Sequence, residues 1–448
     1  MALSGLQIYK LLPRTNCKDC GFPTCLAFSM KLAQKQVELA ACPHVSDDAK
    51  AALSEAAAPP IRLITVSSNG HKLEVGNETA LFRHEKRFFH QPGLFVRVKD
   101  GDPLDEVKST VAEVDDYMVD YVGIELRFDG IAVECTSGDP ETYGSVVGAI
   151  CDATDKLLIL MADDPKVIKA GLAAAGEERK PLIYSADGDN WRRIALQAKK
   201  VGAPLVVRVD DGDLDALAEL TEQVVNFGVD DIVLDPGVRD FNESLATLTA
   251  VRRLALKENF RPLGYPVITF PGEGANDASS EVVLASQQIA KYSGFVVVDH
   301  FTPASAYALL VLRANIFTDP QKPIQVEPGI YEINNPGPDD PVMVTTNFSI
   351  TYFSVANELE SSGKPGWLMV ADAEGMSVLT AWAAGKFDAE RIAKGVKEFG
   401  IEDKINHNSL ILPGHVAVLM GELEEELPGW KIMVGPREAV DLPGFLKM

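Results

Sequence analysis

From residue 61 onward, short runs of β-branched and other apolar residues alternate with longer amphipathic stretches. Such runs predict strands buried on both faces, and the stretches between them have the length and spacing of helices. The strand candidates are Leu63 to Val66, Leu94 to Val98, Gly123 to Leu126, Gly130 to Glu134, Leu157 to Met161, Leu182 to Tyr184, Leu205 to Val209, Ile232 to Leu234, Val267 to Phe270 and Phe295 to Val298. Helix candidates between them include Asp164 to Ala175, Asn190 to Val201, Asp213 to Phe227 and Asn242 to Lys257. The pattern therefore indicates parallel strands with helices outside.

Eight or so such units over roughly 260 residues is the size of a (β/α)8 TIM barrel, and a doubly wound sheet is the alternative. In a barrel, polar residues that follow the strands meet at the C-terminal rim, where barrel enzymes hold their chemistry. The candidates are Asp163, Asp187, Asp210, Asp235, Pro271, Asp299 and His300. An aspartate after a strand is also a common helix cap, so a structural role is the preferred interpretation.

A Pro/Gly-rich segment over residues 318–341 separates this region from a second α/β pattern, about the size of one flavodoxin-like (Rossmann-like) sheet. Its strand candidates are Val342 to Thr345, Trp367 to Val370, Ser409 to Leu412 and Lys431 to Val434, with helices at Thr351 to Ser361, Met376 to Ala384 and Asp388 to Phe399. Ligands of such sheets lie at the carboxyl ends of the strands. The binding candidates are Thr345, Thr346, Asn347, Ala371, Asp372, Ala373, Glu374, Gly375, Met376, Pro413, Gly414, Gly435 and Pro436. These small and hydroxyl-bearing residues suit a bulky neutral ligand, although they are equally common in ordinary loops.

Four of the six cysteines lie near the start, as Cys17, Cys20, Cys25 and Cys42, in the spacing C-x2-C-x4-C-x16-C-P. One C-x2-C, a longer step and a remote cysteine followed by proline favour a [4Fe–4S] cluster over zinc, whose four-cysteine sites usually pair two C-x2-C knuckles. Zinc and unrelated buried thiols stay open as alternatives. A helix predicted from Cys25 to Ala41 would carry one ligand at its start and deliver Cys42 just past its end.

The length of 448 residues predicts three domains, with boundaries at an alanine-rich linker and at the Pro/Gly-rich segment. We expect a cluster domain at residues 1–58, a TIM barrel at 59–320 and an α/β domain at 321–448. The net charge of −23 argues against binding to nucleic acid or to an anionic membrane. The chain has neither a run of about 18 apolar residues nor a signal-peptide pattern, so a cytoplasmic protein is expected.

The three parts together resemble the large (gamma) subunit family of the corrinoid/iron–sulfur protein of the acetyl-CoA pathway. The most specific resemblance runs from Leu6 to Pro13, through Asn16 to Gly21 and Pro23 to Cys25, and ends at Cys42-Pro43. It implies that the four cysteines bind a [4Fe–4S] cluster, that the middle domain is a TIM barrel and that the C-terminal domain binds a cobamide.

The resemblance also implies a methyl carrier. Cobalt would accept a methyl group from methyltetrahydrofolate through a methyltransferase and pass it to acetyl-CoA synthase of the CO dehydrogenase complex. Implied partners are a small TIM-barrel subunit, forming a heterodimer, and a reductive activator or ferredoxin. The D-x-H-x-x-G string of many B12 proteins is absent, so no protein histidine is expected to ligate cobalt, and His415 is interpreted as non-ligating. The rival hypotheses are a pterin-binding barrel methyltransferase and a plain iron–sulfur electron-transfer protein.

Overall fold

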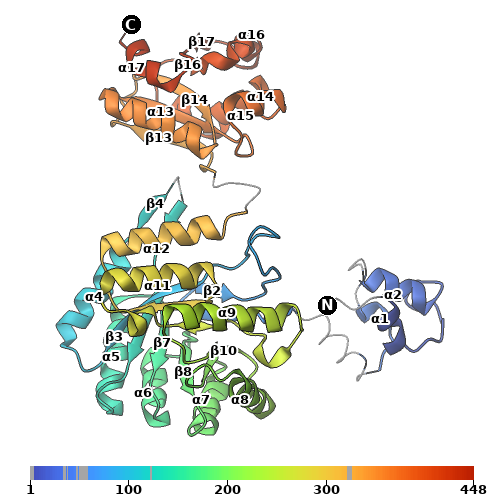
Figure 1. Cartoon of the computed structure of the whole chain (residues 1–448). Coiled ribbons are helices and arrows are strands. Elements are labelled where there is room, and N and C mark those ends of the chain that lie inside the picture. Colours follow the sequence, from blue (N-terminus) through green and yellow to red (C-terminus); the bar gives the residue numbers. More distant parts are fainter. Residues whose placement is uncertain are drawn as a thin grey trace. The chain divides into compact units, whose positions relative to one another are not determined.

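The computed structural model describes residues 5–33, 37, 39–46, 49, 59–121, 124–319 and 325–447 (Figure 1). The chain divides into two compact units. One comprises residues 1–117 and 128–317, and the other comprises residues 118–127 and 318–448. Residues 50–58 and 320–324, which contain the two expected domain boundaries, lie outside the described residues. Among the helices that are described, none combines the length and apolarity needed to cross a bilayer.

The first unit contains a barrel of eight parallel strands, as the alternation of buried runs and helices predicts. In order around the barrel they are β3 (Gly93–Lys99), β6 (Gly130–Glu134), β7 (Leu157–Met161), β8 (Leu182–Ala186), β9 (Leu205–Arg208), β10 (Ile232–Asp235), β11 (Ile268–Thr269) and β12 (Phe295–Val298). β12 pairs with β3, and a parallel bridge between Leu234 and Val267 joins β10 to the start of β11. The Leu234 amide donates to the Pro266 carbonyl at 2.8 Å there, which closes the ring.

Helices follow the strands and cover the outside of the barrel (Figure 1). They are α4 (Leu104–Asp116), α5 (Pro140–Ala153), α6 (Pro165–Ala175), α7 (Trp191–Val201), α8 (Leu214–Phe227), α9 (Phe241–Leu256), the short α10 (Pro271–Gly274), α11 (Ala278–Ala290) and α12 (Pro303–Ile316). Side chains of Asp139, Asp164, Asp213, Asp240 and Asp277 accept backbone N–H groups at the starts of five of them. Aspartates in the loops after strands therefore cap helices, although none of these five is a predicted rim residue.

Two strand candidates are wrong as barrel strands. The first forms an antiparallel hairpin, β1 (Ile64–Ser68) and β2 (His71–Val75), which turns at Asn69-Gly70 with positive φ at both residues. Asn-Gly is a strong hairpin signal, so the sequence held this information. Ile64 and Val66 are fully buried in the same cluster as the barrel interior, and Ser67 pairs with Lys180 just ahead of β8. The hairpin therefore packs against the N-terminal end of the barrel.

The second candidate, Gly123 to Leu126, is β5 (Ile124–Leu126) of another antiparallel hairpin with β4 (Val119–Tyr121). Residue 123 lies outside the described residues. This hairpin belongs to the second unit, where Tyr121 packs against the apolar cluster that contains Leu359 and Leu368. An apolar run predicts that a strand is buried, but it does not say which sheet the strand joins.

The sheet of the second unit has the order β13 (Gly329–Ile333), β15 (Gly366–Ala371), β14 (Val342–Thr346), β16 (Ser409–Leu412) and β17 (Lys431–Val434). The last four strands are parallel, and β13 is an antiparallel edge strand inside the segment expected to be a linker. Alternate residues of β15 enter two different apolar clusters, so both faces of the sheet are buried. The other elements are α13 (Ser349–Ser362), α14 (Val378–Ala383), α15 (Ala389–Glu398), η3 (Ile401–Asp403), η4 (Gly414–Leu419), α16 (Met420–Glu426), η5 (Ala439–Asp441) and α17 (Leu442–Phe445).

The N-terminal part consists of α1 (Gly5–Leu11), α2 (Cys25–Ala33) and the turn η1 (Leu39–Ala41). The helix predicted from Cys25 to Ala41 begins at the expected residue. Its described portion ends at Ala33, and residues 34–36 and 38 lie outside the described residues.

Candidate functional site

Three of the four N-terminal cysteines belong to, or pack against, one small apolar cluster. Cys25 and Cys42 are buried members of it, Cys20 packs against it and Cys17 is exposed. The Asn16 side chain accepts the Cys25 amide at 2.9 Å, which fixes the start of α2 beside the C-x2-C loop. All four side chains are free thiols, and thiolates are the ligands that iron–sulfur clusters and zinc prefer. The residues therefore fit a metal centre near the protein surface.

A polar contact that no motif in the sequence marks lies beside these thiols. His44 Nε2 lies 2.6 Å from an Asp19 carboxylate oxygen, although the two residues are far apart along the segment. Ligand atoms of Cys17, Asp19 and His44 all lie within 4.8 Å of one another. Hydrogen bonds from His44 and then Cys17 lower the pKa of the Asp19 carboxyl. The contact ties the C-x2-C loop to the chain just after Cys42.

The second unit contains a cavity of about 610 Å³ at the carboxyl ends of β14, β16 and β17. Its lining residues come from these strand ends, from α13 and α14, and from η5 and the residues before it. Ile350, Leu379 and Val440 line the cavity and are 66%, 46% and 67% exposed, which is high for large aliphatic side chains. A cavity with an exposed apolar rim is typical of a binding site for a large ligand.

One residue of the cavity wall carries a buried hydroxyl group that has no partner in the described part of the chain. Thr345 lines the cavity and is 1% exposed, and its Oγ1 has no hydrogen-bond partner among the described residues. A buried hydroxyl without a partner costs free energy, because it has lost its bonds to water. A polar group on a bound ligand would satisfy it.

The structure brings four of the predicted binding residues to the cavity, namely Thr345, Pro413, Gly435 and Pro436. The other nine are not among its lining residues: Thr346, Asn347, Ala371, Asp372, Ala373, Glu374, Gly375, Met376 and Gly414. Several lining residues were not predicted, among them Ile350, Ser354, Leu379 and Val440. They lie on α13, on α14 and near η5, and no motif in these segments marks them.

Asn347 organises the loop that follows β15. Its side-chain oxygen accepts the amides of Ala373 and Gly375 at 2.9 and 3.0 Å, and its amide group donates to Gln325 and Asp372. All of these hydrogen bonds join Asn347 to other residues of the second unit. Asn347 therefore shapes the loop rather than lining the cavity.

Further along the same loop, Glu374 accepts a hydrogen bond from Lys386 at 2.6 Å. This bond is the largest cause of the lowered pKa of the Glu374 carboxyl. The ion pair holds the solvent side of the loop.

Gly414 sets the spacing between two loops of the cavity wall. Its amide donates to the Pro436 carbonyl at 2.9 Å. A Cβ at this position would lie 2.6 Å from the Gly435 carbonyl oxygen and 2.9 Å from the Arg437 amide nitrogen, both backbone atoms. Only glycine fits this close approach.

His415 lines the cavity, and its Nε2 lies 3.6 Å from a Glu438 carboxylate oxygen. The two side chains are 34% and 70% exposed. The pair joins the loop after β16 to the residues that follow β17. That His415 does not bind cobalt stays a prediction.

Ion pairs fill the C-terminal mouth of the barrel. Arg97 donates to both carboxylate oxygens of Asp299 at 2.7 Å and to Glu273 at the same distance. Arg239 donates to both oxygens of the fully buried Asp235 at 2.9 Å. Asp235 and Asp299 thus meet at the rim, as predicted, but each holds an arginine.

The remaining rim candidates have other contacts. Asp210 lies 3.6 Å from Arg208. Burial lowers the pKa of this arginine, but Tyr184, Asp210 and Asp163 outweigh it, so the net shift of the pKa is upward. The Asp187 carboxylate accepts two amides in the turn before α7. His300 contacts the buried Glu281 at 2.8 Å. The arrangement provides no pair of free catalytic carboxylates among the described rim residues.

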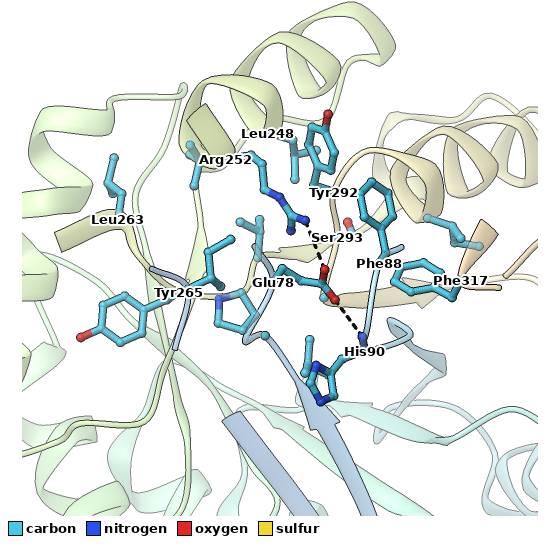
Figure 2. A pocket seen from close by; sticks show the side chains of 18 residues that line it. Glu78, Phe88, His90, Leu248, Arg252, Leu263, Tyr265, Tyr292, Ser293 and Phe317 are labelled. Atoms are coloured by element: carbon cyan, nitrogen blue, oxygen red, sulfur yellow. Dashed lines mark hydrogen bonds and ion pairs between the residues drawn. The ribbon is translucent and has the colours of Figure 1, made fainter. Parts of the chain in front are cut away.

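A second cavity lies at the opposite, N-terminal end of the barrel (Figure 2). Glu78, His90, Arg252, Tyr292 and other residues line it, and its volume is about 40 Å³. That volume suits a few water molecules rather than an organic ligand. This cavity is therefore not a substrate site.

A family model described as "CO dehydrogenase/acetyl-CoA synthase delta subunit" matches residues 64–446, and one described as "Putative Fe-S cluster" matches residues 12–44. The chain belongs to the family that the first model defines. It is 42% identical over 447 residues to the corrinoid/iron-sulfur protein large subunit of Moorella thermoacetica, covering 100% of this chain and 99% of that protein. It is 36% identical to the acetyl-CoA decarbonylase/synthase complex subunit gamma of Archaeoglobus fulgidus, covering 99% and 98%. Among solved structures, dihydropteroate synthase from Thermus thermophilus has a TM-score of 0.40 at 16% identity, covering 57% of this chain and 99% of that chain.

Proposed function

We propose that this protein is a methyl carrier that binds a cobamide in the cavity of its second unit and an iron–sulfur cluster at its N-terminal cysteines. Co(I) of a cobamide is a strong nucleophile that accepts a methyl group, and a low-potential cluster restores it after one-electron oxidation. The methyl group comes from methyltetrahydrofolate through a separate methyltransferase and goes to acetyl-CoA synthase. The functional parts are the cluster domain at residues 1–58, the TIM barrel at 59–320 and the cobamide domain at 321–448.

The observation that carries the proposal is the cavity at the carboxyl ends of β14, β16 and β17. Its parallel strands follow the order β15, β14, β16, β17, in agreement with a flavodoxin-like arrangement, and ligands of such sheets bind at this end. The exposed aliphatic rim of Ile350, Leu379 and Val440 suits the apolar edge of a corrin ring. The relative from Moorella thermoacetica, which matches over the full chain, is named for a corrinoid.

The residues of this chain hold and position the cofactor. Thr345 has a buried hydroxyl available to a polar group of the cobamide. Gly414 keeps the loops after β16 and β17 close together, so the wall at Pro413 and Pro436 stays in place. We expect no axial ligand from His415, which faces Glu438. A cobalt without a protein nitrogen donor favours the four-coordinate Co(I) state.

At the N-terminus, Cys17, Cys20, Cys25 and Cys42 would bind a [4Fe–4S] cluster. The exposed Cys17 leaves the centre accessible to an external electron donor. Proposed partners are a small TIM-barrel subunit in a heterodimer, the methyltransferase, acetyl-CoA synthase and a reductive activator or ferredoxin. The paired arginines in the barrel mouth favour a scaffold role for this barrel over a pterin methyltransferase.

The test is metal analysis and absorption spectroscopy of the full-length protein purified anaerobically with its small subunit. We expect cobalt and iron together, with corrinoid bands above the broad iron–sulfur absorption. The variant Cys20→Ala should lose the iron–sulfur absorption and reductive reactivation, while methyl transfer from chemically reduced cobalt remains. Protein that contains iron but no cobalt would leave only an electron-transfer role. Loss of methyl transfer along with reactivation would make the cluster chiefly structural.

A further inference from the structure

The connection between β2 and β3, residues 76–92, is a long ordered loop with no helix or strand of its own. Loops without secondary structure are rarely longer than ~12–15 residues in compact domains, and this loop is longer. Loops of this length are usually functional or disordered. Here the loop is fixed to the barrel by buried polar contacts. It therefore requires an explanation other than linkage.

The first anchor is the buried carboxylate of Glu78, 5% exposed (Figure 2). One of its oxygens accepts the backbone amides of Phe89 and His90 at 2.7 Å each. Its other oxygen lies 3.4 Å from Arg252 of α9. This carboxylate therefore joins the two ends of the loop and holds both against the barrel.

Arg252 forms a second anchor and is 7% exposed. It donates to the Ala80 carbonyl at 2.7 Å, and its guanidinium lies over the rings of Phe88 and Tyr292 at 5.3 and 5.0 Å (Figure 2). The Tyr292 hydroxyl donates to the Leu81 carbonyl at 2.6 Å. These bonds fix the backbone before the loop tip, and Glu78 fixes the backbone after it.

Arg83 holds the tip to α12. Its guanidinium donates to the Ile316 and Asn315 carbonyls at 2.7 and 2.9 Å, at the C-terminal end of that helix. A cation is favoured there by the helix dipole. The tip of the loop is consequently preorganised.

The surface that this loop presents is mainly basic and aromatic, with one exposed carboxylate, Glu85, which accepts the Phe82 amide at 3.3 Å. Phe82 is 39% exposed and stacks on His84 at 5.6 Å. Lys86 and Arg87 lie over the Phe89 ring at 5.0 and 5.4 Å, and Lys291 lies over Phe82 at 5.2 Å. Within the described part of the chain, no ion pair neutralises Lys86, Arg87 or Lys291. We call the side chains of Phe82, His84, Lys86, Arg87 and Lys291 the basic aromatic patch.

A positive patch on a chain of net charge −23 is a local exception. The overall charge repels long polyanions, so nucleic acid is disfavoured as an occupant. Aromatic and arginine side chains on a rigid support are the composition of protein contact sites. A patch of about five residues is small, as in the transient encounters of electron-transfer proteins.

We propose that the basic aromatic patch is the docking site of an acidic one-electron carrier protein. This inference rests on the proposed function, because the reactivation of cobalt needs electrons from outside the chain. Charge complementarity steers the encounter, and the exposed ring of Phe82 provides an apolar contact. The fixed loop lowers the entropy lost on binding.

The experiment measures the second-order rate at which an acidic ferredoxin, kept reduced, reduces the cluster of the holoprotein, as a function of ionic strength. The variant Lys86→Glu/Arg87→Glu should be about tenfold slower at low salt, within the range of electrostatic steering, and should show a weaker salt dependence. The matched control is Arg192→Glu/Arg193→Glu on the outer surface of α7, where both residues are exposed. It changes the net charge equally and should keep a near wild-type rate. Phe82→Ser, which keeps every charge, should slow the reaction about threefold.

Equal slowing by both double variants would mean that only net charge matters and would overturn the proposal, as would a wild-type rate in the loop variant. A small chemical reductant, titanium(III) citrate, should reduce the cluster at the same rate in all variants. If titanium(III) citrate reduces no cluster even in the wild-type protein, the proposed function is contradicted instead of the docking site. Thermal unfolding of each variant checks that the fold is retained.

Discussion

The hydroxyl of Thr345 offers a sharp test of the cavity, through the substitution Thr345→Val. Valine has nearly the same shape, so the change removes one polar atom and leaves packing almost unchanged. In the structure this oxygen is buried and has no partner within the described residues. The substitution should therefore affect the empty and the loaded protein in opposite directions.

The size of each effect follows from the energetics of buried hydrogen bonds. A buried polar group without a partner costs about 1–3 kcal/mol, so its removal should stabilise the cobamide-free protein by about 1 kcal/mol. A hydrogen bond made to the cofactor has a net value of about 0.5–1.5 kcal/mol. Its loss should weaken cobamide binding about twofold to twelvefold, since about 1.4 kcal/mol is a factor of ten.

The assay combines denaturant unfolding of the cobamide-free protein with equilibrium binding of cobamide followed by absorption. Thr346→Val is the matched control, because Thr346 is also buried with a hydroxyl that has no partner among the described residues, and it does not line the cavity. The control should raise the stability of the empty protein by a similar amount and leave the affinity unchanged. Equal affinities of the Thr345→Val variant and the wild type would refute the reasoning, because the hydroxyl would then have no role in binding.

Two further substitutions test the wall of the cavity and the barrel mouth. Gly414→Ala forces a methyl group against backbone atoms at 2.6–2.9 Å, so we expect a loss of about 1–3 kcal/mol in stability and a reduced cobalt content. The control is Gly421→Ala on α16, where a Cβ meets open space. It should be neutral or stabilising. Cobalt content at the wild-type level in Gly414→Ala would contradict this. Asp235→Asn removes the buried counter-charge of Arg239, which keeps Glu273 as its second partner, and should cost about 1–3 kcal/mol in denaturant unfolding. Cobalt per folded chain should be unchanged, because Asp235 lies in the other unit. Wild-type stability of this variant would show that the mouth is more hydrated than the burial indicates.

The barrel shows how far local patterning reaches. Eight of ten apolar runs form the parallel strands in chain order, because a strand covered by helices on one side and by the barrel interior on the other needs apolar residues throughout. The same patterning failed for residues 63–66 and 123–126, where burial against a different partner gives the same composition. It also missed β13, an edge strand with only one hydrogen-bonded neighbour and partly exposed side chains.

The candidate sites divide in a similar way. The four cysteines are proposed as ligands on their spacing alone, because ligands close in sequence leave a local signal, and this stays a prediction. The cavity could be placed at the strand ends, yet only Thr345, Pro413, Gly435 and Pro436 among the predicted residues line it. Its walls come from helices and from residues after β17, which acquire a common surface only when the sheet forms.

The sequence alone determined the parallel α/β barrel and the presence of a second α/β sheet, because helix and strand periodicity are local properties. Tertiary structure decided which carboxylates cap helices, which hold arginines in the barrel mouth and which hydroxyl is left unpartnered in the described part of the cavity. It also decided that a basic aromatic loop is fixed by Glu78 and Arg252, two residues far apart in the chain. Such roles depend on burial and on contacts between distant segments, which exist only after the chain has folded.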